Sequence, residues 1–208
     1  MRRRSKIVEP IVREIAVRYR DALLEDWEER KDAVSVSFTG RIIVQSRERC
    51  FDHYGCYERP DDKKSYPHEA VISIRGPLAP PERLRFPAQL HVLYLCFDDL
   101  APDEPDGDKI VALFDETMRL QILDFIDELP PKTTLRIHCA AGISRSRAVA
   151  AAIRRLRGQD DLGEFVDGQP NGHVYRLMLG LRPIPLVWKI RDAIARDVVA
   201  DYQERRHG

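Results

Sequence analysis

Cysteine is scarce in this sequence, with four residues among 208. A fold held together by disulfides needs a higher density of cysteine, so we expect no disulfide framework. Long apolar runs are missing too, and none approaches the roughly 20 residues that a membrane-spanning helix requires. The basic residues 1–4 are not followed by the apolar core of a signal peptide. We therefore expect a soluble, cytoplasmic protein with no membrane partner.

An excess of charge of either sign is also absent, because Lys+Arg and Asp+Glu both number 34. A balanced chain has no long-range field that attracts nucleic acid, so we expect no nucleic-acid partner. Apolar residues make up 43% of the sequence, and the length is sufficient for one domain with a substantial core. We find no internal repeat.

Apolar residues recur every three to four positions in several segments, which is the period of an amphipathic helix. This spacing predicts helices over residues 7–31, 110–129, 148–156, 170–181 and 186–202. Asp106 or Asp108 is expected to cap the second of these helices, and Pro130 ends it.

Short runs rich in branched apolar residues predict strands over residues 70–74, 91–97 and 134–138. Residues 34–38 and 41–45, joined by a Thr-Gly turn, predict a hairpin. Residues 46–68 and 160–168 are expected to be irregular. Near-continuous apolar strands indicate a sheet covered on both faces. We therefore predict an α/β fold with a central mixed sheet flanked by helices, preceded by an N-terminal helix and hairpin.

The most informative stretch, residues 138–147, lies between the last predicted strand and a helix. Five residues separate Cys139 from Arg145, and the hydroxyl of Ser146 follows. In a loop of this length the backbone N–H groups converge on an anion, and the start of the helix favours negative charge at the same point. The planar fork of Arg145 can bind two phosphate oxygens. This arrangement predicts a phosphate site with a thiol at its base.

The remaining residues of this stretch are expected to shape the substrate-binding loop. Gly142 permits a backbone conformation closed to other residues, and small side chains beside it leave room for the phosphate. His138 is expected to hold the loop through hydrogen bonds rather than to act as a base. The predicted substrate-binding residues are His138, Ala140, Ala141, Gly142, Ile143 and Ser144.

Cys139 is the predicted nucleophile. A helix N-terminus and a nearby cation lower the pKa of a cysteine, so we expect a thiolate at neutral pH. The thiolate would attack phosphorus and form a cysteinyl-phosphate. Ser146 can donate to the sulfur and assist its departure in the second step.

The leaving oxygen needs a proton, which a carboxylic acid on a nearby loop can supply. Asp99 is the preferred candidate, because strand alternation places it on the same face as Leu95 and Phe97. Asp98 is the alternative. The loop that follows holds three further candidates, Asp103, Asp106 and Asp108.

A second cluster, Cys50, His53 and Cys56 with His68 further on, has spacings that could supply zinc ligands. It lacks the paired spacing of closed zinc sites, so we favour free cysteines and surface histidines. We expect no metal at this cluster.

The stretch HCAAGISRS at residues 138–146 resembles the signature of cysteine-dependent protein tyrosine phosphatases, most closely of their dual-specificity branch. Residues 170–177 are similar to the family's Pro-Asn segment, and residues 97–99 resemble its general-acid loop. The resemblance covers about residues 69–181. It implies a mixed sheet flanked by helices and catalysis without metal or cofactor. It also suggests that Cys96 forms a protective disulfide with the nucleophile, although Cys96 in a predicted strand is more simply a core residue.

The combined expectation is a single phosphatase-like domain over residues 1–208, with an N-terminal helix, hairpin and loop in 1–68 and a catalytic core in 69–208. Its substrate would be a phosphorylated protein or a small phosphomonoester, with phosphotyrosine first and phosphoserine or phosphothreonine as additions. Two alternatives stay open at this point. One is a phosphatase for phosphoinositides or RNA ends, and the other is a phosphate-binding module without turnover.

Overall fold

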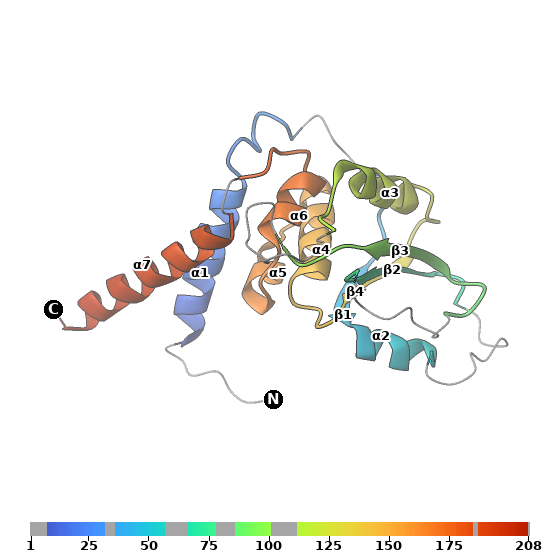
Figure 1. Cartoon of the computed structure of the whole chain (residues 1–208), viewed down its shortest axis with the longest axis horizontal. Helices are drawn as coiled ribbons and strands as arrows, with labels where there is room; N and C mark the ends of the chain where they lie inside the picture. Colours follow the sequence, from blue (N-terminus) through green and yellow to red (C-terminus); the bar gives the residue numbers. More distant parts are fainter. Residues whose placement is uncertain are drawn as a thin grey trace.

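The structure is a computed structural model that describes residues 8–31, 36–56, 66–77, 86–100, 112–184 and 187–207. Its centre is a four-stranded sheet with the strand order β1-β4-β2-β3 (Figure 1). The strands are β1 (Ile42–Ser46), β2 (Glu69–Arg75), β3 (His91–Cys96) and β4 (Thr134–Cys139). Each neighbouring pair runs parallel. The predicted α/β fold, with a central sheet flanked by helices, is confirmed.

The predicted hairpin is wrong for the part of it that the structure describes. Residues 36–41 contain no strand, and β1 pairs in parallel with β4, with Ile42 opposite Leu135. The chain passes so close to the start of β4 that a Cβ on Gly40 would lie 1.8 Å from the carbonyl oxygen of Thr133. Gly40 therefore serves a close approach rather than a turn, and the sheet of the described strands is parallel rather than mixed.

Helices cover both faces of the sheet (Figure 1). On β2, Ala70, Ile72 and Ile74 face the main core, whereas Val71 faces a second cluster built on α2 (Arg47–Tyr54). The main core also includes residues of α3 (Glu116–Asp127), α4 (Arg145–Leu156) and α6 (Gly172–Met178). The uninterrupted apolar character of β2 is explained by this burial on both faces.

Two helices lie in segments that were expected to be irregular. Helix α2 begins where the side chain of Ser46 accepts a hydrogen bond from the amide of Arg49, and ends at Gly55, whose φ is 65°. Helix α5 (Leu162–Asp167) follows α4. Both helices are too short for a clear periodic signal, and buried residues such as Phe51 and Phe165 hold them in place.

The other helices agree with the prediction in type and differ at their ends. Helix α1 (Val8–Leu23) is shorter than predicted. Helix α3 begins later than predicted, and its cap is Asp115, whose side chain accepts from the amide of Met118 at 2.9 Å. The proposed caps Asp106 and Asp108 lie outside the described residues. Helix α7 (Val187–His207) packs beside α1 (Figure 1).

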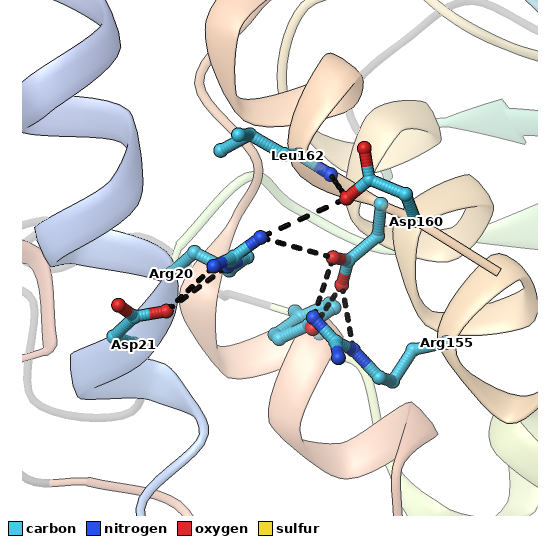
Figure 2. Close-up of polar contacts among 7 residues, drawn as sticks. Arg20, Asp21, Arg155, Asp160 and Leu162 are labelled. Atoms are coloured by element: carbon cyan, nitrogen blue, oxygen red, sulfur yellow. Dashed lines mark hydrogen bonds and ion pairs between the residues drawn. The ribbon is translucent and has the colours of Figure 1, made fainter. Parts of the chain in front are cut away.

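A network of charged side chains anchors α1 to the rest of the molecule. Asp161 is fully buried, accepts two hydrogen bonds from Arg155 at 3.1 and 2.6 Å, and accepts one from the hydroxyl of Tyr175 at 2.5 Å. From α1, Arg20 reaches toward this group and lies 3.7 Å from Asp160 (Figure 2). The network therefore ties α1 to both α4 and α6. Within the described ranges, no helix has the length and apolar character needed to cross a membrane.

Candidate active site

Cys139 ends β4, and strand alternation turns its side chain toward the main core. The residue is 3% exposed, and its Sγ lies 3.2 Å from the hydroxyl oxygen of Ser146. Burial raises the pKa of this thiol, but hydrogen bonds from the hydroxyl and amide of Ser146 and the amide of Gly142, with the charge of Arg145, outweigh burial. The pKa of Cys139 therefore lies below its ordinary value, as a nucleophilic thiol requires.

The loop over residues 139–145, called the phosphate loop below, is supported from behind by the junction of β1 and α2. The amide of Arg47 donates to the carbonyl of Ala140 at 3.2 Å. Gly142 has a φ of 71°, and a Cβ there would lie 2.5 Å from the backbone carbon of Gln45. A glycine is therefore needed both for the backbone conformation and for the close approach.

Arg145 begins α4 and is 9% exposed. Its Nη1 donates to the carbonyl of Phe97, just beyond β3, at 2.8 Å. Its buried Nε has no hydrogen-bond partner among the described residues. A buried donor without a partner is unfavourable, and an anion oxygen would satisfy it.

Ser144 precedes α4 but does not cap it with its side chain. Its hydroxyl instead donates to Oδ1 of Asp99 at 2.6 Å. The same carboxylate oxygen accepts from Nδ2 of Asn171 at 3.1 Å, while Oδ1 of Asn171 caps α6 by accepting from Val174. Asp99 is therefore held beside the phosphate loop from two sides.

Asp98 has a different environment from Asp99. Its Oδ2 accepts from the amide of Ala112 at 3.1 Å, and its own amide donates to the carbonyl of Ala112 at 2.7 Å. Asp98 thus pins the segment that leads into α3. The further acidic candidates Asp103, Asp106 and Asp108 lie outside the described residues.

His138 precedes Cys139 but faces the opposite side of the sheet, because successive strand residues alternate. Its ring packs edge-on to Phe51 at a centroid distance of 5.4 Å. Neither ring nitrogen bonds a side chain in the described part of the chain, and the ring interacts instead with the backbone of Cys139. Burial lowers the pKa of His138 to about 4, and the neutral ring contributes packing.

A pocket of about 420 Å³ opens above Cys139. Sequence reasoning identified its floor but missed its walls, which include Tyr19 from α1 and Val187 and Arg191 from α7. Helices α1 and α7 pack closely against the start of α6. A Cβ on Gly172 would lie 2.7 Å from both the hydroxyl of Tyr19 and a methyl of Val187. No local signal could have revealed these residues, because α1 and α7 are remote from the phosphate loop in sequence. The predicted residues that line the pocket are Asp99, Cys139, Ala140, Ala141, Ile143, Ser144 and Arg145.

Arg147 lies beneath the phosphate loop rather than at the pocket rim. Its Nε donates to the carbonyl of Gly142 at 3.2 Å, and its Nη1 donates to Glu164 of α5 at 2.8 Å. Gly168 leaves room for it, since a Cβ there would lie 2.0 Å from Cδ of Arg147. The role of Arg147 in supporting the loop was not evident from the sequence.

Cys50 and Cys96 are free thiols. Cys96 lies on β3, which β2 separates from β4, so its backbone is about 9–10 Å from that of Cys139. A disulfide needs less than about 7 Å, so this pairing would require the backbone to move. Cys50 and Cys56 are buried, and His53 bonds Glu69 at 3.1 Å. In the described ranges no group of three His, Cys, Asp or Glu side chains could hold a metal ion.

No protein-family model and no curated protein matches this chain. One similar solved structure is described as the crystal structure of Tk-PTP in the active form. The two chains share 20% sequence identity, and the match covers 80% of this chain and 94% of the other, with a TM-score of 0.35. A similarity this loose assigns neither a fold family nor an activity to the chain.

Proposed function

We propose that this protein is a phosphomonoester hydrolase of the cysteine-dependent protein tyrosine phosphatase type, acting first on phosphotyrosine. The observation that carries the proposal is Cys139 itself. It is a buried thiol of lowered pKa at the floor of a pocket, where it accepts a hydrogen bond from Ser146, and the pocket also contains a buried arginine with an unpartnered Nε. A phosphate dianion matches this combination in charge and in its number of acceptor oxygens.

In the first step, the thiolate of Cys139 attacks phosphorus while the bond from phosphorus to the tyrosyl oxygen breaks. Arg145 and the amides of the phosphate loop stabilise the charge on the transferring group. Asp99, as a carboxylic acid, gives its proton to the leaving phenolate oxygen. The products are a tyrosine hydroxyl, a cysteinyl-phosphate and the Asp99 carboxylate.

In the second step, a water molecule attacks phosphorus and the bond from phosphorus to sulfur breaks. Asp99 now acts as the base that accepts a proton from the water. The hydroxyl of Ser146 donates to the departing sulfur, which leaves as a thiolate. Inorganic phosphate is released, and both Cys139 and Asp99 return to their starting states. No metal or cofactor is required.

The pocket walls support an aryl phosphate over a polyanionic substrate. Among the described lining residues, Tyr19, Pro170 and Val187 offer apolar surface for a phenyl ring. The cations of the described lining are Arg145 and Arg191, and Asp99 opposes them in charge. A phosphoinositide or an RNA end would favour more positive charge than this. Phosphoserine and phosphothreonine remain further proposed substrates of the same pocket.

The proposal is tested by hydrolysis of p-nitrophenyl phosphate by the wild type and by Cys139→Ser. We expect the variant to lose at least about 10³-fold in kcat/KM, because the nucleophile is removed. Cys96→Ser makes the same chemical change outside the pocket lining and is the matched control, which should remain active. Mass spectrometry of the quenched wild-type reaction should find the phosphoryl group on Cys139.

Phosphate binding without turnover would overturn the proposal in favour of a binding module. Turnover that survives in Cys139→Ser would also overturn it, because another nucleophile would then be responsible.

A further inference from the structure

A second hollow, of about 480 Å³, adjoins the candidate active site. It lies between α1, α5 and the phosphate loop, and is called the α1–α5 groove below. Its walls are largely apolar, with Val12 and Ile15 from α1 and Phe165 and Val166 from α5. A concave, mostly apolar site with a few polar groups is the usual form of a ligand-binding pocket.

The groove shares part of its lining with the pocket above Cys139. Five residues line both: Tyr19, Ile143, Gln169, Pro170 and Arg191. At their junction lies Ile143, a large apolar side chain that is 46% exposed. A ligand whose phosphate is held by the phosphate loop can therefore extend past Ile143 into the groove.

We propose that the α1–α5 groove binds an apolar side chain next to the phosphorylated residue of a peptide or protein substrate. This inference rests on the phosphatase function proposed above and specifies its substrate class. An apolar side chain that enters the groove would be removed from water by Val12, Ile15 and Phe165, which favours binding in proportion to the buried area.

The polar groups at the junction favour a peptide over a lipid chain. Nη1 of Arg191 donates to Oε1 of Gln169 at 2.7 Å, and both side chains face the two cavities. A guanidinium has five donors, and an amide side chain both donates and accepts. These groups can bond the carbonyl and N–H groups of a peptide backbone between the two side chains. An acyl chain offers them no partner.

The test uses a set of phosphotyrosine peptides with one leucine placed in turn at positions −2 to +2 in a glycine and serine background. Wild-type kcat/KM should rise roughly tenfold or more for one leucine position over the unsubstituted peptide. Val12→Glu places a charge in the groove and should abolish this preference. Val199→Glu makes the same change at a 40% exposed position of α7 that lines neither cavity, and should retain it.

Thermal unfolding of each variant is measured alongside, and Ile15→Glu replaces Val12→Glu if the latter does not fold. The inference is overturned if no leucine position is preferred, or if the preference survives the groove substitutions. It is also overturned if a long alkyl phosphate gains as much over methyl phosphate as the leucine peptide gains, because the groove would then take a lipid chain.

Failure of the proposed function would give a different experimental result. The wild type would then hydrolyse neither p-nitrophenyl phosphate nor any peptide. Binding of fluorescent peptides to Cys139→Ser, followed by anisotropy, needs no turnover and still reports the leucine preference. The two proposals can therefore fail independently.

Discussion

The hydroxyl of Ser144 donates to Oδ1 of Asp99 at 2.6 Å, and joins two loops that are 45 residues apart in the sequence. One loop follows β4 and binds the phosphate in our proposal, and the other follows β3 and supplies the acid. Asn171 donates to the same oxygen at 3.1 Å. The carboxyl group is thus positioned before a substrate arrives, which is the condition for efficient proton transfer.

Asp99→Asn should lower kcat for phenyl phosphate by about 10²- to 10⁴-fold, because the leaving phenolate loses its proton donor. The loss should be much smaller with p-nitrophenyl phosphate, whose leaving group departs readily without a proton. Asp98→Asn keeps an acceptor for the amide of Ala112, so its effect on both substrates should be small. Steady-state kinetics with the two substrates check this assignment, and equal losses in the two variants would refute it.

Gly142→Ala should destabilise the protein and weaken phosphate binding. Its φ of 71° disfavours alanine, and the new Cβ would also overlap the backbone of Gln45. Gly158 is a matched control, because its φ is 67° but a Cβ there meets open space. Gly158→Ala should cost only about 1–2 kcal/mol, the strain of a left-handed residue.

Urea unfolding measures the stability of both variants, and inhibition by phosphate measures its binding. A Gly142→Ala protein that binds phosphate like the wild type would mean that the contact between the phosphate loop and the β1–α2 junction is unimportant.

Asp161→Asn should cost about 3–5 kcal/mol of unfolding free energy, because Arg155 would lose its charged partner in a buried site. Burial raises the pKa of Tyr175, so its hydroxyl stays protonated and also needs this acceptor. Asp160→Asn alters the neighbouring carboxylate, whose side chain is 77% exposed and 3.7 Å from Arg20 (Figure 2). Its effect should be within about 0.5 kcal/mol. Urea unfolding of the two variants checks this, and similar values for both would contradict it.

His138 should make the protein less stable in acid. Its pKa is about 4 in the folded state against an ordinary value of 6.5, since burial and then the charge of Arg47 disfavour the imidazolium. The unfolded chain therefore binds the proton first as the pH falls. The contribution of the neutral ring is complete above pH 6.5 and is lost between pH 6.5 and 4, by about 3 kcal/mol in all.

His138→Phe keeps a ring beside Phe51 and removes the titration. Between pH 7 and 4.5 this variant should lose roughly 2 kcal/mol less stability than the wild type, as measured by denaturant unfolding at the two pH values. An equal loss of unfolding free energy in the two proteins between pH 7 and 4.5 would show that His138 does not titrate as expected.

Local sequence patterns were sufficient to predict the elements whose residues lie close together in the sequence. The β4–loop–α4 unit around Cys139 and Arg145 was predicted correctly, because strand, glycine turn and helix start follow one another within a few residues. The preference for Asp99 over Asp98 came from strand alternation. In the structure Asp99 lines the pocket, whereas the carboxylate of Asp98 accepts a hydrogen bond from the amide of Ala112. Their catalytic roles stay predictions.

Sequence periodicity failed where packing decides. A hairpin was expected around Gly40, but β1 instead pairs in parallel with β4. Gly40 packs against the backbone of Thr133 rather than forming a turn. Helix α2 is too short to give a periodic signal, and buried residues such as Phe51 hold it against the sheet. These are contacts between distant segments, which no local pattern records.

The sequence by itself therefore determined the chemistry at the floor of the site: a thiol, an arginine and a loop that can surround a phosphate. Only the tertiary structure decided what stands around that floor. Helices α1 and α7, from opposite ends of the chain, supply Tyr19, Val187 and Arg191 to the pocket wall. The physical reason is that reactivity depends on groups a few residues apart, whereas the shape of the pocket depends on which remote surfaces bury one another.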